Sequence, residues 1–537
     1  MKFDGLTYRY PSRRGVVYGR RGIVCTSQSL AAQAGLDALK RGGNAVDAIL
    51  TTAICMTVLE PTSNGLGSDA FALYWDAATK QLYGLNGSGY APQALTPEAM
   101  KQKGYTAMPD RGWAAVTVPG APSAWAELHQ RFGRLPFASL FEPAISYAEN
   151  GYPVQPITSL LWQRSVDTFA PFKSDPSFAP LFETFFAKGA PQPGNLVTLP
   201  DHAKTLRLLA DSHCESYYRG ALAGEIDAFS RKTGGYLRKE DLASYRAEWV
   251  TPVHLNYHGY DICEIPPNGH GIVALMALNI LQQMSGMTGR DDVETIHRQL
   301  EAMKLAFVDG REYITDPRHM KMPVDYLLSR QYAARRAAEI GKDALMPKPI
   351  SPDCGGTVYL CAADEEGNMI SYIQSNFKGF GSGIVIPHRG IALNDRGCSF
   401  SLDPSHANTL KPGKKPYHTI IPGFLMKDGE AVGPFGVMGG FMQPQGHVQV
   451  MMNLIDFGLN PQEALDAPRW QWTGGKKVEI EAGFGSEVAE ALRARGHEIT
   501  VKKDFTSFGR GQMILRNKEG VLAGATEPRA DGTVAAW

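Results

Sequence analysis

Two glycines stand directly before a threonine, Gly355-Gly356-Thr357, where a loop pattern gives way to a strand pattern. Cleavage between Gly356 and Thr357 would leave a new N-terminus that carries both a hydroxyl nucleophile and its own base. The freed α-amine has a reference pKa of about 7.7–8, against about 10.4 for a lysine, so it can accept a proton near neutral pH. Threonine paired with its own terminal amine is an activated nucleophile. The tripeptide therefore predicts a self-processing amide hydrolase, and its alternative is a plain glycine-rich loop.

Thr357 lies between two different sequence patterns. Residues 341–356 (GKDALMPKPISPDCGG) contain three prolines and three glycines without apolar periodicity, which predicts an exposed linker. Residues 357–363 alternate as a strand, and residues 369–374 repeat that pattern after a short turn. We expect a β-hairpin with Gly367 at the turn position that needs a positive φ. The sheet would fix the hydroxyl of a threonine at the first strand position.

The end of the second strand carries three polar residues, Gln374-Ser375-Asn376. The strand ends opposite a hairpin turn lie side by side, so these side chains could contact Thr357. The alternative is ordinary polarity at a strand end, and the pattern alone leaves both possibilities open.

Gly439 and Gly440, in GVMGGFMQPQGH, follow an apolar strand pattern. Adjacent glycines can present backbone N–H groups to a cleft, where each donor stabilises a tetrahedral oxyanion by roughly 2.7–4 kcal/mol. The alternative is a tight turn that leads into a helix, which we expect at residues 447–455.

Composition excludes several classes of partner. The 537 residues are 43% hydrophobic, and 54 Lys plus Arg balance 54 Asp plus Glu, so no charge excess indicates binding to nucleic acid or to an anionic membrane. Residues 1–21 lack the apolar region of a signal peptide, and we expect a cytoplasmic protein. The seven cysteines form no Cys-x-x-Cys pair, which indicates reduced thiols and no zinc site.

Longer stretches make the sequence similar to a known family. They are GIVCTSQSLAAQAGLDALKRGGNAVDAILTTAICMTVLEPTSNGLGSDAFALY, TVPGAPSAW, EAMKLAFVDGREYITDP and NLIDFGLNPQEALDAPRW. Together they resemble the γ-glutamyltranspeptidase (glutathione hydrolase) family of N-terminal-nucleophile hydrolases over nearly the whole chain. GFGSGIVIP, KPYHTIIPGF and GVMGGFMQPQGH are most similar to its branch of γ-glutamyltransferase-like proteins and class IV cephalosporin acylases.

The resemblance implies an α+β fold, a four-layer αββα sandwich, in a precursor that cuts itself between Gly356 and Thr357. Residues 1–356 would form a large chain and residues 357–537 a small chain, and both would contribute to one core. Two chains of each kind could assemble into a heterotetramer. A small-molecule amide substrate is implied, and no metal or organic cofactor is expected.

The same resemblance implies roles for individual residues. Thr357 matches the nucleophile, and Ser375 matches a hydroxyl that hydrogen-bonds it. Asn376 lies at or next to a substrate-binding position, and Gly439 and Gly440 match the glycines of the oxyanion hole.

The positions that hold glutamate in the γ-glutamyl enzymes differ in this chain. Ser88 stands where the family has the arginine that binds the α-carboxylate, and Ser399 replaces the acidic residue that binds the α-amine. His418-Thr419 replaces a serine pair that also holds the carboxylate, and Arg396 could supply a substitute cation. A site without a partner for a substrate charge binds that substrate poorly.

These observations predict hydrolysis or transfer of γ-glutamyl groups from glutathione-type substrates through an acyl-enzyme. Two alternatives remain. One is an acylase for another dicarboxylic acyl amide, such as a glutaryl amide. The other is a scaffold of the same fold that never undergoes cleavage.

Overall fold

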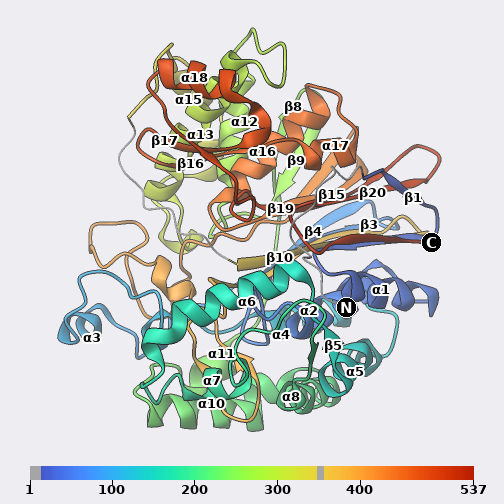
Figure 1. Ribbon diagram of the computed structural model, residues 1–537, viewed down its shortest axis with the longest axis vertical. Coiled ribbons are helices and arrows are strands. Elements are labelled where there is room, and N and C mark those ends of the chain that lie inside the picture. The colour runs from blue at the N-terminus through green and yellow to red at the C-terminus, as the bar shows by residue number, and fades with distance from the viewer. Residues whose placement is uncertain (1–13, 347–355) are drawn as a thin grey trace.

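The computed structural model describes residues 14–346 and 356–537, so Gly355 and most of the predicted linker lie outside the described residues. Two seven-stranded sheets face each other, and helices cover the outer face of each sheet (Figure 1). The prediction of an α+β fold with four layers, αββα, is confirmed.

The strands of the first sheet follow the order β1 (Val17–Gly19), β20 (Leu522–Thr526), β19 (Arg510–Arg516), β15 (Glu430–Met438), β14 (Gly423–Lys427), β9 (Tyr260–Glu264) and β8 (Val253–Tyr257). Those of the second sheet follow the order β21 (Thr533–Ala536), β2 (Gly22–Thr26), β10 (Gly356–Asp364), β11 (Met369–Phe377), β3 (Asp69–Asp76), β4 (Gln81–Gly87) and β7 (Glu248–Val250). Smaller sheets are formed by β5 (Tyr152–Pro153) with β6 (Leu196–Val197), by β12 (Val385–Ile386) with β13 (Ile391–Ala392), and by β16 (Trp470–Gly474), β17 (Lys477–Glu481) and β18 (Glu498–Lys502).

The helices that pack on the two large sheets include α1 (Ser29–Lys40) and α2 (Ala45–Leu59) on the second, and α12 (Gly271–Leu281) and α16 (Met442–Ile455) on the first. α13 (Val293–Tyr313) packs against α12. The other helices are α3 (Pro97–Gln102), α4 (Ala121–Phe132), α5 (Glu142–Asn150), α6 (Pro156–Phe169), α7 (Ala179–Thr184), α8 (Pro200–Asp211), α9 (Glu215–Arg219), α10 (Ala221–Lys232), α11 (Lys239–Ser244), α14 (Val324–Leu327), α15 (Arg330–Ala337), α17 (Pro461–Asp466) and α18 (Ser486–Ala494). Within the described ranges, no helix is long and apolar enough to span a bilayer.

The predicted hairpin forms the centre of the second sheet. β10 and β11 pair antiparallel, and Gly367 has the expected positive φ of 90° at the turn. β10 also pairs with β2, and β11 pairs with β3, so strands from both sides of the Gly356–Thr357 bond alternate in one sheet. The first sheet is mixed in the same way, because β14 pairs with β9. Cleavage at Thr357 would therefore leave the two products joined by continuous ladders of hydrogen bonds.

The start of α16 differs from the sequence prediction. The helix begins at Met442, five residues before the expected His447. The Met442 amide donates to the Gly439 carbonyl at 3.0 Å, so the glycine turn already leads into the helix. The polar residues that follow, Gln443 and Gln445, are buried, and for that reason this first turn lacks the apolar periodicity that would have revealed it.

A buried ion pair on α13 holds the chain just before the linker. The Lys304 ammonium lies 2.7 Å from the Glu301 carboxylate, and both side chains are fully buried. The second Glu301 oxygen accepts from the Leu345 amide at 3.0 Å, and the Leu345 carbonyl accepts from Lys304 at 3.3 Å. His297 contacts the Gly341 carbonyl at 3.1 Å. The N-terminal end of the predicted linker is thus fixed to the core, although residues 341–343 are exposed as expected.

This cluster also has the composition of a metal site, because ligand atoms of His297, Glu301 and His497 lie within 4.8 Å of one another. The Lys304 ammonium already neutralises the carboxylate, and His297 contacts His497 directly at 2.9 Å. We interpret the group as an ion-pair and hydrogen-bond network that ties α13 to His497 and residues 341–345.

We expect Glu301→Ala to destabilise the protein by about 3–5 kcal/mol, because it leaves the Lys304 ammonium buried without its carboxylate. Urea unfolding followed by circular dichroism measures the change. Glu312→Ala, at an exposed position of the same helix, is the matched control and should stay within about 0.5 kcal/mol of the parent. Equal stability of the two variants would contradict the role given to Glu301.

Candidate active site

Thr357 occupies an irregular point at the start of β10. The pairing register of β10 with β11 shifts between Gly356 and Val358, so Thr357 lies at a bulge in the ladder. Its side chain is buried, and its Oγ1 lies 3.0 Å from the Ser375 Oγ on the neighbouring strand. The hairpin thus brings together the two hydroxyls that the sequence analysis placed at its open end.

The residues after Ser375 continue this end of the hairpin. The Phe377 amide donates to the Ser375 Oγ at 2.7 Å, and Phe377 adopts a positive φ of 81°, an uncommon conformation for a bulky side chain. Phe377 is also the register partner of Gly356. The Asn376 side-chain oxygen Oδ1 accepts from the Ser68 hydroxyl at 2.8 Å, which directs this side chain toward the 63–68 loop.

β15 packs across the hairpin, and Gly439 and Gly440 directly follow the end of this strand. The Ser371 hydroxyl on β11 donates to the Phe435 carbonyl at 3.4 Å, and a Cβ on Gly436 would lie 2.3 Å from the Tyr359 ring. β15 then ends at Met438, and the next residues are Gly439 and Gly440, with φ of 141° and 60°. Neither glycine amide donates a hydrogen bond to the residues that the structure describes.

A cavity of about 360 Å³ lies next to both elements, although its described lining does not include Thr357, Ser375, Gly439 or Gly440. Its wall includes Phe377, two residues after Ser375, and Phe441, directly after Gly440. The hairpin end and the glycine turn therefore border one space. The full lining is Ala107, Arg311, Phe377, Cys398, Ser399, Phe400, Ser401, His406, Asn408, Tyr417 and Phe441.

The predicted substrate-binding residues fall into two groups. Ser399 lines the cavity, whereas Ser88 is fully buried and donates to the Asn86 side chain at 2.7 Å. Arg396 is also fully buried behind the wall, with its guanidinium 4.5 Å from the Phe377 ring centroid. It donates to the Thr419 hydroxyl at 2.6 Å.

His418 and Asp69 complete this buried layer. The Ile420 amide donates weakly to His418 Nδ1 at 3.4 Å, so the other ring nitrogen carries the proton and donates to the Asp69 carboxylate at 2.9 Å. Asp69 is the register partner of Ser375 on the adjacent strand. The layer thus supports the strand that presents the Ser375 hydroxyl.

Burial dominates the electrostatics of this layer. It raises the pKa of Asp69 to about 7, although the Arg396 guanidinium favours the charged carboxylate. It lowers the pKa of Arg396 to about 10, and burial together with Arg396 holds the pKa of His418 well below its usual range. Arg396 stays cationic and His418 stays neutral near pH 7.

Several cavity residues were not predicted from the sequence. Arg311 lies in the last turn of α13, and its guanidinium is 3.9 Å from the Phe441 ring centroid and 5.8 Å from that of Tyr417. The two aromatic residues are neighbours in sequence of predicted site residues: Phe441 follows Gly440, and Tyr417 precedes His418. The positions of Phe441 and Tyr417 in the sequence could therefore have indicated that they line the site. Arg311 could not be found in this way, because its approach to the Phe441 ring depends on how α13 packs in the tertiary fold.

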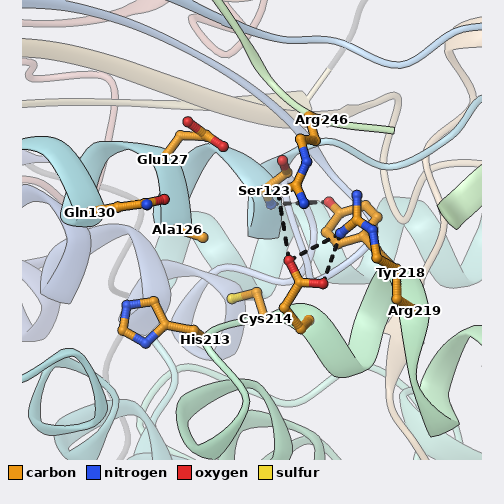
Figure 2. A pocket seen from close by; sticks show the side chains of 10 residues that line it. Ser123, Ala126, Glu127, Gln130, His213, Cys214, Tyr218, Arg219 and Arg246 are labelled. Atoms are coloured by element: carbon orange, nitrogen blue, oxygen red, sulfur yellow. Dashed lines mark hydrogen bonds and ion pairs between the residues drawn. The ribbon is translucent and has the colours of Figure 1, made fainter. Parts of the chain in front are cut away.

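A second cavity, of about 450 Å³, is lined by residues of α4, the loop after α8, α9 and Arg246. Figure 2 shows Arg219 and Arg246 close together at one end and His213 at the other. Arg219 pairs with Glu215 at 2.9 Å, and Arg246 lies 3.7 Å from the same carboxylate. Both arginines thus face the Glu215 carboxylate, and we do not assign this cavity a ligand.

A buried strand-end threonine, a hydroxyl beside it and a glycine turn at a common cavity, all within an αββα sandwich, define the class of N-terminal-nucleophile hydrolases. A crystal structure of a cephalosporin acylase from Bacillus halodurans superposes with a TM-score of 0.96 and is 58% identical, covering 100% of this chain and 99% of that one. A glutathione hydrolase-like proenzyme of Bacillus subtilis is 35% identical over 96% of this chain and 98% of its own. An oxamate amidohydrolase proenzyme of Klebsiella pneumoniae is 34% identical with the same coverage.

The family model for gamma-glutamyltranspeptidase matches residues 31–537. The chain belongs to the γ-glutamyltranspeptidase family, and it is an enzyme of the hydrolase and acyltransferase type found there. The family resemblance drawn from the sequence is confirmed.

The raised pKa of Asp69 generates a prediction for stability. An aspartate in the unfolded chain titrates near 3.9, so between about pH 4 and 7 the folded protein holds a proton that the unfolded chain has lost. This carboxyl therefore makes the protein less stable as pH rises through that window. We expect Asp69→Asn to make the decline shallower by up to about 1.4 kcal/mol per pH unit.

Urea unfolding at several pH values within this window measures the effect, with and without the Asp69→Asn change in a Thr357→Ala background. An unchanged pH dependence in the Asp69→Asn variant would show that the Asp69 carboxyl does not titrate there.

Proposed function

We propose that Thr357 first cleaves its own precursor and then serves as the acyl-accepting nucleophile of an amide hydrolase. The observation that carries the proposal is the Thr357–Ser375 contact of 3.0 Å at a bulge next to Gly356. In the precursor the nitrogen of Thr357 is an amide and cannot act as a base. The Ser375 hydroxyl is therefore the polar group placed to orient the Thr357 Oγ by a hydrogen bond.

Self-cleavage follows from this arrangement. Thr357 Oγ attacks the Gly356 carbonyl carbon, the Gly356–Thr357 C–N bond breaks, and an ester between Gly356 and the Thr357 Oγ forms. The Oγ proton passes to the departing nitrogen. Water then hydrolyses the ester, which leaves a carboxylate on Gly356 and a free α-amine on Thr357. Gly356 has no side chain, so the hydroxyl can approach its carbonyl.

Turnover uses the same Thr357 hydroxyl and nitrogen, but the nitrogen is now a free amine that can act as a base. The Thr357 α-amine takes the Oγ proton, Oγ attacks the substrate carbonyl, and the N–H groups of Gly439 and Gly440 stabilise the oxyanion. The proton passes to the leaving amine as the amide C–N bond breaks. Water, or an acceptor amine in a transfer reaction, then releases the acyl group.

The acyl group is the open part of the proposal. Glutathione-type γ-glutamyl amides are the family-level expectation, and one relative carries a glutathione hydrolase-like name. Ser399 at the cavity favours a second candidate, because a hydroxyl cannot neutralise the α-ammonium of a γ-glutamyl group. That candidate is the mono-amide of a dicarboxylic acid without an amino group. Oxamate, named for another relative, is such a compound, and a glutaryl amide is a longer one.

The cleavage products form one assembly because both sheets contain strands from either side of Thr357. Pairing of two such assemblies into a heterotetramer and a cytoplasmic location both stay predictions.

We expect the purified protein to run as two bands. Dividing 58.5 kDa in proportion to 356 and 181 residues gives about 39 and about 20 kDa. Thr357→Ala should remain a single band of 58.5 kDa and release no anilide from acyl-anilide substrates. A wild-type chain that stays intact on long incubation would favour the non-catalytic scaffold, and an active Thr357→Ala variant would exclude this nucleophile.

Ser375→Ala should slow both self-cleavage and turnover by roughly tenfold or more, because the Thr357 hydroxyl loses the partner that orients it. Ser371→Ala is the matched control, since Ser371 lies on the same strand but bonds Tyr359 at 2.8 Å instead of Thr357. A time course of the precursor band compares the two variants. Equal rates would contradict the role of Ser375.

A further inference from the structure

The strands β14 and β15 part before they reach the glycine turn. Their ladder ends at the pair Gly423 and Phe435, whereas β15 stays paired with β19 as far as Met438. Two residues beyond the last pair, Ile421 and Val437 would face each other in a continued ladder, and their backbone amides would bond across it. These two residues are not paired in the described strands, and both are fully buried. Their amides therefore need other acceptors.

Two side chains of α16 provide these acceptors. The Ile421 amide donates to the Gln443 side-chain oxygen at 2.9 Å, and the Val437 amide donates to His447 Nε2 at 3.1 Å. Gln443 and His447 are four residues apart, so they lie on the same face of the helix. Both side chains are buried. The helix thus separates the two strand ends and satisfies their polar groups.

Glu264 orients the imidazole of His447. It ends β9 and is the register partner of Gly423, at the last rung before the strands part. Its Oε1 lies 2.6 Å from His447 Nδ1, and both side chains are buried. Because His447 Nε2 accepts from Val437, Nδ1 carries the proton and donates to the carboxylate. The carboxylate therefore sets the tautomer and the ring orientation that the Val437 amide requires.

The two separated strand ends lead to opposite walls of the cavity of about 360 Å³. The segment before Ile421 contains Tyr417, and the segment after Val437 passes through the glycine turn to Phe441. The rings of Tyr417 and Phe441 stack with their centroids 6.3 Å apart and an interplanar angle of 28°. The distance that α16 imposes between the strand ends is thus carried into the cavity.

α16 also holds the glycine turn on both sides. After the turn, the Gly439 and Gly440 carbonyls accept from backbone amides of the first helical turn at 3.0 and 3.1 Å. Before the turn, His447 holds Val437, two residues ahead of Gly439. Since both carbonyls are bonded to the helix, the orientation of the two glycine amides depends on how β15 enters the turn. The contact between His447 and Val437 fixes this entry.

We propose that His447, oriented by Glu264, is a positioning residue for the oxyanion donors. It fixes the end of β15 so that the Gly439 and Gly440 amides are presented to the substrate carbonyl. The inference rests on the proposed function, because it assumes that these amides stabilise the oxyanion. Donors that are held in place before the reaction stabilise its transition state most, and a displacement of about 1 Å costs roughly a hundredfold in rate.

Two substitutions of His447 separate its two contacts. Counted in bonds from Cβ, the polar atoms of asparagine lie where Nδ1 lies, and those of glutamine lie where Nε2 lies. His447→Asn therefore keeps a partner for Glu264 and loses the acceptor of the Val437 amide. We expect it to lower kcat for anilide hydrolysis by roughly 10- to 100-fold and to leave KM within about twofold, because oxyanion donors act in the transition state. His447→Gln keeps the acceptor and should stay within about fivefold of the wild-type kcat.

The matured enzyme is assayed with whichever of γ-glutamyl and glutaryl anilide the wild type hydrolyses faster. Each kcat is referred to the fraction of cleaved chain on a denaturing gel, and circular dichroism reports folding. Asn453→Ala is the matched control, because this buried residue in the last turn of α16 bonds the Ala464 carbonyl at 3.0 Å. It should keep kcat within about twofold of the wild type. Equal kcat in the His447→Asn and His447→Gln variants, or an equal fall in Asn453→Ala, would make His447 structural and overturn the inference.

A tetrahedral and a planar ligand give a readout that does not need turnover. A boronic acid with the acyl chain of the hydrolysed anilide, 4-boronobutanoate for a glutaryl chain, bonds the Thr357 Oγ at boron and places an oxygen where the oxyanion forms. The matching carboxylate, glutarate, stays planar. His447→Asn should weaken boronate binding about as much as it lowers kcat and leave carboxylate binding within about twofold. Unchanged boronate binding would reject the positioning role. A wild type that hydrolyses neither anilide would instead reject the proposed reaction, on which the inference rests.

Discussion

The antiparallel pairing of β10 with β11 is the interaction on which the rest of the structure depends. It fixes the Thr357 and Ser375 hydroxyls 3.0 Å apart, and its register shift places the Gly356–Thr357 bond at a bulge. β2 and β3 hold the hairpin from both sides, and β15 crosses it with the glycine turn. Strand pairing is rigid enough to position two small side chains without any further loop or cofactor.

Local patterns in the sequence were sufficient to find the hairpin, and they made Thr357 and Ser375 possible neighbours. Strand alternation, a glycine at the turn and the geometry of an open hairpin end allow that contact, with ordinary strand-end polarity as the alternative, and the family resemblance pointed to Ser375. The residues of the cavity wall could not be predicted from local patterns alone. Arg311 approaches Phe441 only because α13 packs behind the sheet, and no spacing rule relates residues so far apart. The sequence also suggested Arg396 as the cation for substrate, because burial behind Phe377 leaves no trace in a local pattern.

Two arginines near the site illustrate how position decides what a charge can do. Arg396 lies between Asp69, Thr419 and the Phe377 ring, where burial lowers its pKa to about 10 and it stays cationic near neutral pH. Arg311 rests on an aromatic face at the cavity wall, with its guanidinium 3.9 Å from the Phe441 ring centroid. The first arginine stabilises a buried layer, and the second packs on the aromatic side chains that line the cavity.

Each large sheet contains strands from both sides of Thr357, and this has a consequence for folding of the enzyme. Once the chain is cut, loss of structure also separates two polypeptides, and their recombination becomes a bimolecular process that depends on concentration. The separated halves would expose unpaired strand edges, which favour aggregation over reassembly. If the chain is cut as proposed, folding would have to come first and cleavage second, and the persistence of the two-chain protein would depend on how slowly it unfolds.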